Sequence, residues 1–87
     1  MSYKIVFTRN AEKDYKIVSR SPYAKKVKEL LSIVERNPYE PPIDELVGNM
    51  EGLISRRINL QHRFVYEVNE ETHTVKIRSM WTHYGDN

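Results

Sequence analysis

The chain has 87 residues, a formal net charge of +2 and no cysteine. This length suits one domain with one modest core, so we treat residues 1–87 as a single domain. Without cysteine there is neither a disulfide nor a thiolate ligand for a metal. The N-terminal segment turns polar too early for a signal peptide, and no apolar run approaches the roughly 20 residues of a membrane span. We therefore expect a cytoplasmic protein that does not bind a membrane.

The first half of the chain predicts one strand and two helices. Residues 3–8 are rich in β-branched and aromatic side chains, which favours a strand. Asn10 suits the N-cap of a short helix over residues 11–19. Ser21-Pro22 suits the start of a second helix that ends near Arg36. The apolar stripe of this helix predicts packing against the core: Val27, Leu30, Leu31 and Val34.

The second half predicts a long loop and three strands. Prolines and glycines make residues 37–53 irregular, and loops of this length in small domains tend to be functional or mobile. Within the loop, residues 44–46 are compatible with one helical turn. Residues 54–60 and 63–69 predict a β-hairpin with a bend at Gln61-His62, and residues 72–84 predict the last strand. The resulting order is β-α-α-β-β-β, an α+β fold in which an antiparallel sheet carries both helices on one face.

Cations gather in the predicted hairpin. Between positions 55 and 63 there is no acidic residue, and four side chains are basic: Arg56, Arg57, His62 and Arg63. Arginine suits phosphate because its planar guanidinium donates hydrogen bonds in pairs and stays charged. Such a local patch says more about nucleic-acid binding than the weak net charge does. A solvated basic strand explains the same residues equally well.

The remaining candidates are weaker individually. The chain has no phosphate-binding glycine loop, zinc-ligand spacing or nucleophile motif, and its histidines are too scattered to suggest a metal site. His83, between Trp81 and Tyr84, has a side chain that can donate a proton at neutral pH. Aromatic faces beside arginines can stack unpaired bases. The loop carboxylates Asp44 and Glu45, taken by themselves, are better explained as solvated acids than as functional groups.

Four short motifs carry a resemblance to a known family. They are a G-x-x-x-G at Gly48 and Gly52, SRRIN at 55–59, HRFVYEV at 62–68 and HY at His83-Tyr84. In this order, and over nearly the whole chain, they resemble the Txe/YoeB family of bacterial toxins within the RelE-like superfamily. The resemblance implies a RelE-like fold and the toxin of a toxin–antitoxin pair. Such toxins enter the ribosomal A site and cleave mRNA without a metal or other cofactor, which inhibits translation.

The resemblance also implies roles for individual residues. In the implied reaction the 2′-hydroxyl attacks the adjacent phosphate and the 5′-oxygen leaves, which requires a base, cations and an acid. Arg63 is expected to stabilise the charge of the transition state. Arg57 is expected to bind the substrate phosphate, with Arg56 beside it. His83 is expected to be the general acid, and Tyr84 is expected to position the substrate or the base.

The chain departs from the family at three places. The family's general base is a glutamate, and this position holds the shorter Asp44, followed by Glu45. We favour Asp44 because it occupies the aligned position, although Glu45 has the usual length. Val47 replaces a lysine of some members, and residues 85–87 extend a C-terminus that often ends at the tyrosine.

These departures leave two functions to compare. The first is a ribosome-dependent endoribonuclease, or mRNA interferase. The second is a non-catalytic RNA- or ribosome-binding module that kept the basic face but lost cleavage. The aspartate at position 44, in place of the family's glutamate, is the observation that suggests it. The enzyme is favoured by retention of four residues together: Arg57, Arg63, His83 and Tyr84.

The resemblance implies partners as well. It predicts a cognate antitoxin of the YefM/Axe-like kind, together with the A site of the 30S subunit and its mRNA, and it admits a homodimer. We expect a C-terminal segment of the antitoxin to fold on binding and to place acidic residues near Arg57 and Arg63.

Overall fold

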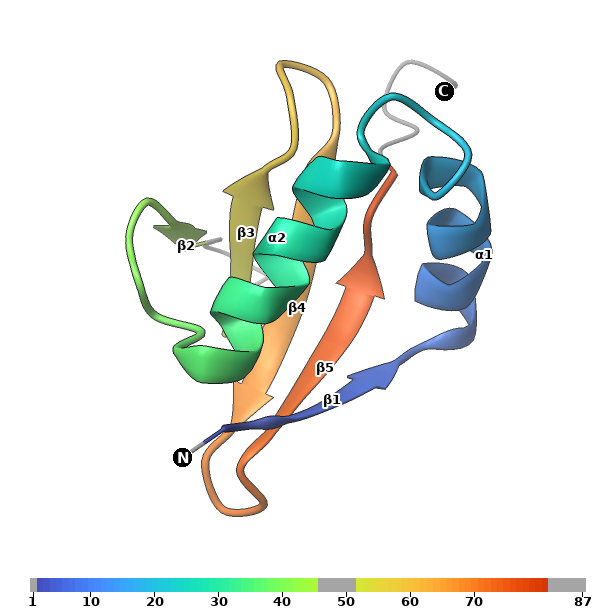
Figure 1. Ribbon diagram of the computed structural model, residues 1–87. Helices are drawn as coiled ribbons and strands as arrows, with labels where there is room; N and C mark the ends of the chain where they lie inside the picture. Colours follow the sequence, from blue (N-terminus) through green and yellow to red (C-terminus); the bar gives the residue numbers. More distant parts are fainter. Residues whose placement is uncertain (1, 46–51, 82–87) are drawn as a thin grey trace.

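The structure is a computed structural model that describes residues 2–45 and 52–81 (Figure 1). Its elements follow the order β1 (Lys4–Phe7), α1 (Arg9–Val18), α2 (Ala24–Arg36), β2 (Asp44–Glu45), β3 (Leu53–Arg57), β4 (Arg63–Asn69) and β5 (Thr74–Ser79). The predicted β-α-α-β-β-β order is confirmed, and β2 is an additional short strand. Among the described residues, neither helix is long and apolar enough to cross a membrane.

The strands form one sheet in the order β1-β5-β4-β3-β2. The pairs β2–β3, β3–β4 and β4–β5 are antiparallel, as the predicted hairpin requires. β1 pairs with β5 in parallel, so the sheet is mixed and not wholly antiparallel. A parallel pair needs a long connection, and the helices and the other strands together provide one.

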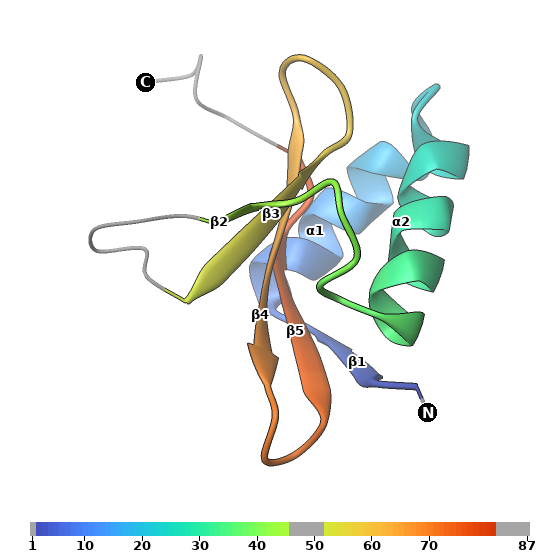
Figure 2. The same ribbon diagram turned by 90° about the vertical axis from the view of Figure 1, so that its left-hand side faces the viewer.

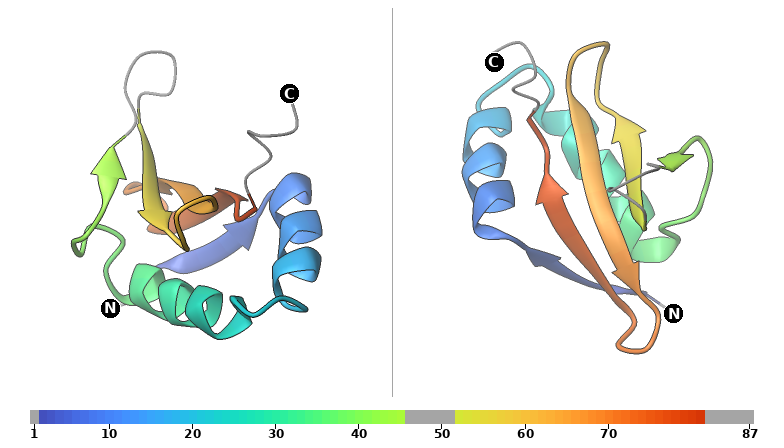
Figure 3. Two further views of the ribbon diagram at one scale, coloured as in Figure 1. Left: turned by 90° about the horizontal axis from the view of Figure 1, so that it is seen from above. Right: turned by 180° about the vertical axis from the view of Figure 1, so that it is seen from behind.

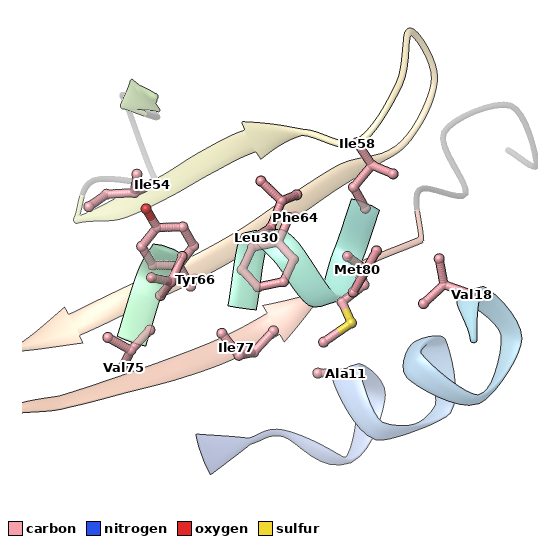
Figure 4. Packing of buried hydrophobic residues seen from close by; sticks show 12 residues of the cluster. Ala11, Val18, Leu30, Ile54, Ile58, Phe64, Tyr66, Val75, Ile77 and Met80 are labelled. Atoms are coloured by element: carbon pink, nitrogen blue, oxygen red, sulfur yellow. The ribbon is translucent and has the colours of Figure 1, made fainter. Parts of the chain in front are cut away.

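Both helices cover the same face of the sheet, as predicted (Figures 2 and 3). α2 lies over the middle of the sheet, and α1 lies beside the end of β5 (Figure 1). The core fills the space between these helices and the strands (Figure 4). The largest fully buried side chains are those of Tyr66, Phe64 and Ile77 in the sheet and of Met80 just beyond β5. The predicted stripe of α2 packs here: Val27, Leu30 and Val34 are buried, and Leu31 is partly buried against them.

The start of α1 differs from the prediction. Its N-cap is Thr8, whose Oγ1 accepts a hydrogen bond from the amide of Ala11 at 3.0 Å, and Asn10 lies inside the helix. Thr8 is fixed by β5, because its amide donates to the carbonyl of Ile77 and its hydroxyl donates to the carbonyl of Arg78. The sheet therefore selects the capping residue.

The start of α2 differs as well, whereas its predicted end at Arg36 is confirmed. The helix begins at Ala24, and Ser21 belongs to the preceding turn. Ser21 Oγ donates to the carbonyl of Val18 at 2.7 Å and accepts from the amide of Tyr23 at 3.1 Å. Its hydroxyl thus closes the connection between the two helices.

The segment that we expected to form a helical turn is extended. Asp44 pairs with Ser55, and Glu45 pairs with Ile54, in the antiparallel pair β2–β3. An extended segment here gives the edge of β3 backbone partners that a helical turn would not supply.

The predicted hairpin is confirmed, but β3 ends at Arg57 and not at Leu60, so the turn takes up residues 58–62. The side chain of Asn59 organises this turn, because its Oδ1 accepts hydrogen bonds from the amides of Gln61 at 2.8 Å and His62 at 2.6 Å. The last strand, β5, is shorter than predicted and ends at Ser79, and residues 82–84 of that prediction lie outside the described part of the chain.

A buried carboxylate fixes the chain just beyond β5. Asp14 of α1 is 2% exposed, and its Oδ2 accepts hydrogen bonds from the amides of Met80 at 3.1 Å and Trp81 at 3.3 Å. These amides follow the last residue of the strand, so an acceptor must come from outside the sheet. Asp14 thereby ties the end of the sheet to α1.

We predict that Asp14→Ala lowers the free energy of unfolding by about 1–3 kcal/mol, because two largely buried amides lose their acceptor. Lys13→Ala is the matched control, since Lys13 is an exposed neighbour on the same helix, and its effect should stay within about 0.5 kcal/mol. Urea unfolding of the three proteins measures both values. Equal stability of the two variants would contradict the role of Asp14.

Candidate functional site

Alternation along β3 divides the predicted basic patch between the two faces of the sheet. Successive residues of a strand point to opposite sides. Ile54 and Arg56 face the helices and are buried. Ser55 and Arg57 face the other way, and Arg57 is exposed. We call this second side the helix-free face, and its relevant residues are Asp44, Ser55, Arg57 and Arg63.

Three of these side chains are in contact. Arg63 Nη1 lies 3.1 Å from Asp44 Oδ2 and donates to Ser55 Oγ at 3.2 Å. The sheet dictates this meeting, because β2 pairs Asp44 with Ser55 and β4 places Arg63 opposite Arg57. The Asp44 side chain is 57% exposed and that of Arg63 is 29% exposed. A carboxylate that solvent can reach is thus held against a partly covered cation.

Arg57 adds a second cation to this face. It lies directly opposite Arg63 in the β3–β4 register and is exposed. Like charges directly opposite on a sheet repel each other, and an anion bound between them would relieve that repulsion. The guanidinium groups also suit the geometry of a phosphate group. The helix-free face therefore combines a carboxylate with two guanidinium groups, the kind of group that suits a phosphate.

Arg56 does not lie on this face. Its side chain is buried, with Nε donating to the Tyr66 hydroxyl at 3.2 Å. Nη1 donates to the carbonyl of Pro42 at 3.4 Å, and Nη2 donates to that of Pro38 at 3.5 Å. Burial raises the pKa of Tyr66, and the charge of Arg56 partly opposes this shift. The position differs from the substrate contact that we expected, because alternation turns Arg56 away from the helix-free face.

His62, the other basic residue of the predicted patch, is also buried. Its ring stacks on Trp81 with centroids 3.6 Å apart and packs edge-on against Tyr23 at 6.4 Å. This aromatic cluster and Asp14 together fix Trp81, the last described residue before the predicted His83 and Tyr84.

Several predicted site residues are not placed by the structure. His83, Tyr84 and the side chain of Glu45 lie outside the described part of the chain, as do Val47 and residues 85–87. Ser55 is a contact that the sequence analysis did not single out. Its alternation with Arg56 in a predicted strand would have placed it on the same face as Arg57.

Two hollows on the described surface have different chemistry. A groove of about 470 Å³ runs between α2, residues 40–44 and β3, and Asp44 and Arg57 both line it. A hollow of about 570 Å³ lies at the β4–β5 turn, and its charged lining consists of three glutamates (67, 70 and 71) and Lys76. Acids predominate in the hollow, whereas the cations that line the groove outnumber its acids, so the groove is the better place for an anion. The described residues hold no group of three or more side chains suited to binding a metal ion.

Comparison with known proteins shows which family the sequence resembles. Residues 7–84 match the sequence profile of the YoeB-like toxin of bacterial type II toxin–antitoxin systems. A YoeB/ParE toxin from Agrobacterium tumefaciens is 30% identical, with a TM-score of 0.84, and the match covers 93% of this chain and 99% of that one. The sequence matches no curated protein closely enough to add a further relative.

YoeB from Staphylococcus aureus has been solved in complex with YefM and as a dimer. It is 35% identical to this chain, with a TM-score of 0.79 in either structure, and the match covers 97% of this chain and 100% of that one. The RelBE2 complex from Mycobacterium tuberculosis, at 23% identity, a TM-score of 0.76 and coverage of 95% and 100%, shows the fold alone. The fold is RelE-like, and since the family profile spans most of the sequence, the chain belongs to the YoeB-like toxins of bacterial type II toxin–antitoxin systems.

Proposed function

We propose that this toxin is a ribosome-dependent mRNA endoribonuclease that acts in the cytoplasm. It cleaves mRNA in the ribosomal A site when the 2′-hydroxyl attacks the adjacent phosphate and the 5′-oxygen leaves. The observation that carries the proposal is the contact between Asp44 and Arg63 on the helix-free face, with Arg57 opposite. This arrangement supplies a proton acceptor beside the cations that a pentavalent phosphorane needs.

Asp44 is proposed as the general base. Its carboxylate is the one that the described structure places against Arg63, at 3.1 Å. A proton moving from the 2′-hydroxyl to Asp44 leaves a nucleophile within reach of the phosphate that Arg63 binds. Glu45, next to it on β2, is the second candidate for this role.

Arg63 is proposed to stabilise the phosphorane. A guanidinium offers five N–H donors, so it can bind a phosphoryl oxygen and still contact a carboxylate. Ser55 supports this role by accepting a hydrogen bond from Arg63 Nη1, which fixes the guanidinium over the sheet. Arg57 is proposed to bind the phosphate from the opposite strand.

The remaining roles rest on the family resemblance. His83 is proposed as the general acid that protonates the leaving 5′-oxygen, and Tyr84 is proposed to position the substrate or the base. The mechanism assigns no metal, and Arg56 is not part of the substrate-binding set because its guanidinium is buried.

We also propose a YefM-like antitoxin as partner, since the related YoeB from Staphylococcus aureus forms a complex with YefM. Its C-terminal segment would fold on this domain and place acidic residues near Arg57 and Arg63. The dimer of that relative makes a homodimer of this chain part of the proposal.

Growth arrest combined with cleavage distinguishes an enzyme from a binding module. Induction of the wild type should arrest growth and cut mRNA on isolated ribosomes, whereas His83→Ala and Arg63→Ala should do neither while still binding ribosomes. Toeprinting of the mRNA and cosedimentation with ribosomes measure the two properties. Ribosome binding by a wild type that leaves mRNA intact would replace the enzyme with the non-catalytic module.

The identity of the base follows from single-turnover cleavage on programmed ribosomes. Asp44→Ala should lower the rate by about 10²–10⁴-fold, the typical loss for a general base. Glu45→Ala should have a much smaller effect, and the control Glu40→Ala removes a carboxylate of the same loop that pairs with Arg36. A large loss confined to Glu45→Ala would transfer the role to Glu45. Near-normal rates in both variants and in the double variant would exclude a catalytic role for either carboxylate.

Charge reversal on the helix-free face should weaken the binding of the antitoxin. We expect Arg57→Glu to speed dissociation of a co-purified YefM-like partner by about tenfold or more, because acidic residues would then meet a like charge. Arg36→Glu, on α2, is the control for total charge. Surface plasmon resonance at two salt concentrations measures the rates. Equal dissociation of the two variants would place the antitoxin elsewhere.

A further inference from the structure

Asp44 belongs to a strand that is too short to fix its own position. β2 consists of Asp44 and Glu45, lies at the edge of the sheet and, within the described part of the chain, pairs with β3 alone. The preceding residues, 37–43, form neither helix nor strand. A catalytic group must be held within about 0.5 Å of its productive position, and two strand residues supply few of the contacts for this. Other contacts must restrain the chain that leads to Asp44.

The guanidinium of Arg56 restrains this chain from the core side. It donates to the carbonyls of Pro42 at 3.4 Å and Pro38 at 3.5 Å, and to the hydroxyl of Tyr66 at 3.2 Å. The Tyr66 hydroxyl in turn donates to the carbonyl of Pro38. Each of the carbonyl contacts of Arg56 is long, but its charge strengthens them. Two neighbouring strands thus hold both ends of the segment from Pro38 to Pro42.

Burial of the Arg56 guanidinium removes a charge from water and therefore costs hydration free energy. Arg56 is 3% exposed, and its three acceptors are neutral oxygens. A buried charge is tolerated only when hydrogen-bonded, and it is a poor source of stability compared with an apolar side chain of similar size. The presence of an arginine here is therefore better explained by the chain segment that its hydrogen bonds hold in place than by a contribution to the stability of the fold.

We propose that Arg56 is a positioning residue for Asp44. Only Ile43 separates the Pro42 carbonyl, which Arg56 holds, from Asp44. Ser55, the neighbour of Arg56 on β3, pairs with Asp44 and binds Arg63 on the other face. β3 therefore restrains both Asp44 and Arg63. Ser55 acts on the helix-free side of the strand, and Arg56 acts on the covered side. The inference rests on the proposed function, because it gives these contacts a purpose in that reaction.

A cycle of variants separates positioning from folding. Arg56→Met and Tyr66→Phe should each slow single-turnover cleavage by about 10–100-fold at saturating ribosomes, because a small displacement of a catalytic group is costly. Neither should change the affinity for ribosomes. In the Asp44→Ala background the same substitutions should cause no further loss. Tyr66→Phe is the milder change, and it keeps the test open if Arg56→Met folds poorly.

The control is Arg36→Met, since Arg36 also binds the loop, through Glu40, but at the surface. It should cleave at the wild-type rate. Two results would overturn the inference: equal losses in the Asp44 and Asp44→Ala backgrounds, which mark a general structural role, or wild-type rates in both Arg56→Met and Tyr66→Phe.

Amide hydrogen exchange gives a readout that does not need cleavage. Arg56→Met and Tyr66→Phe should speed exchange of the backbone amides in the β2–β3 pair, at Asp44 and Ser55, and leave that of Val75 in β5 unchanged. If the wild type cleaves no mRNA, the proposed function fails by itself, and faster exchange at β2 still supports the hold on Asp44. Unchanged exchange at β2 would overturn the inference whether or not the wild type cleaves.

Discussion

The pairing of β3 with β4 is the constraint on which the rest of the structure depends. It sets Arg57 opposite Arg63 on one side and Arg56 beside Tyr66 on the other. A shift of one residue would exchange the two sides of a strand. It would turn Arg57 into the core and Arg56 out of it. The buried aromatic side chains of β4, Phe64 and Tyr66, oppose such a shift, so the core determines which arginines lie on the helix-free face.

The described elements show how far the sequence alone determines this fold. Local periodicity predicted β1, both helices and the hairpin, because each pattern belongs to neighbouring residues. The parallel pairing of β1 with β5 has no local signal, since its partners are distant in the sequence. The same cause explains the caps: Thr8 acts as N-cap because β5 holds it, and neither Asn10 nor Ser21 had a signal that distinguished it from a true cap.

The site was predictable to a different degree. Arg63 and Asp44 came from the family resemblance, and the structure brings their side chains together at 3.1 Å. Counting basic residues between positions 55 and 63 overestimated the patch, because adjacent strand residues cannot share a face. Arg56 is buried for this reason, and His62 is buried because its ring packs against Trp81 and Tyr23. Alternation is visible in the sequence once the strand is assigned, whereas the hold of Arg56 on Pro38 and Pro42 is a tertiary contact with no sequence pattern.

The proline-rich segment after α2 has a geometric task. It leaves α2 on the covered face and turns back to the edge of the sheet, where β2 pairs with β3 (Figures 2 and 3). Contacts hold it along the way: the Tyr39 hydroxyl donates to Glu70, which also accepts from Tyr3. Burial and the Glu70 carboxylate raise the pKa of Tyr39, so its hydroxyl keeps the proton that it donates. Of the segment 37–53 that we predicted to be functional or mobile, residues 37–44 are therefore tied to the sheet. Their length allows a chain that leaves a helix on the covered face to place the Asp44 carboxylate against Arg63 on the helix-free face.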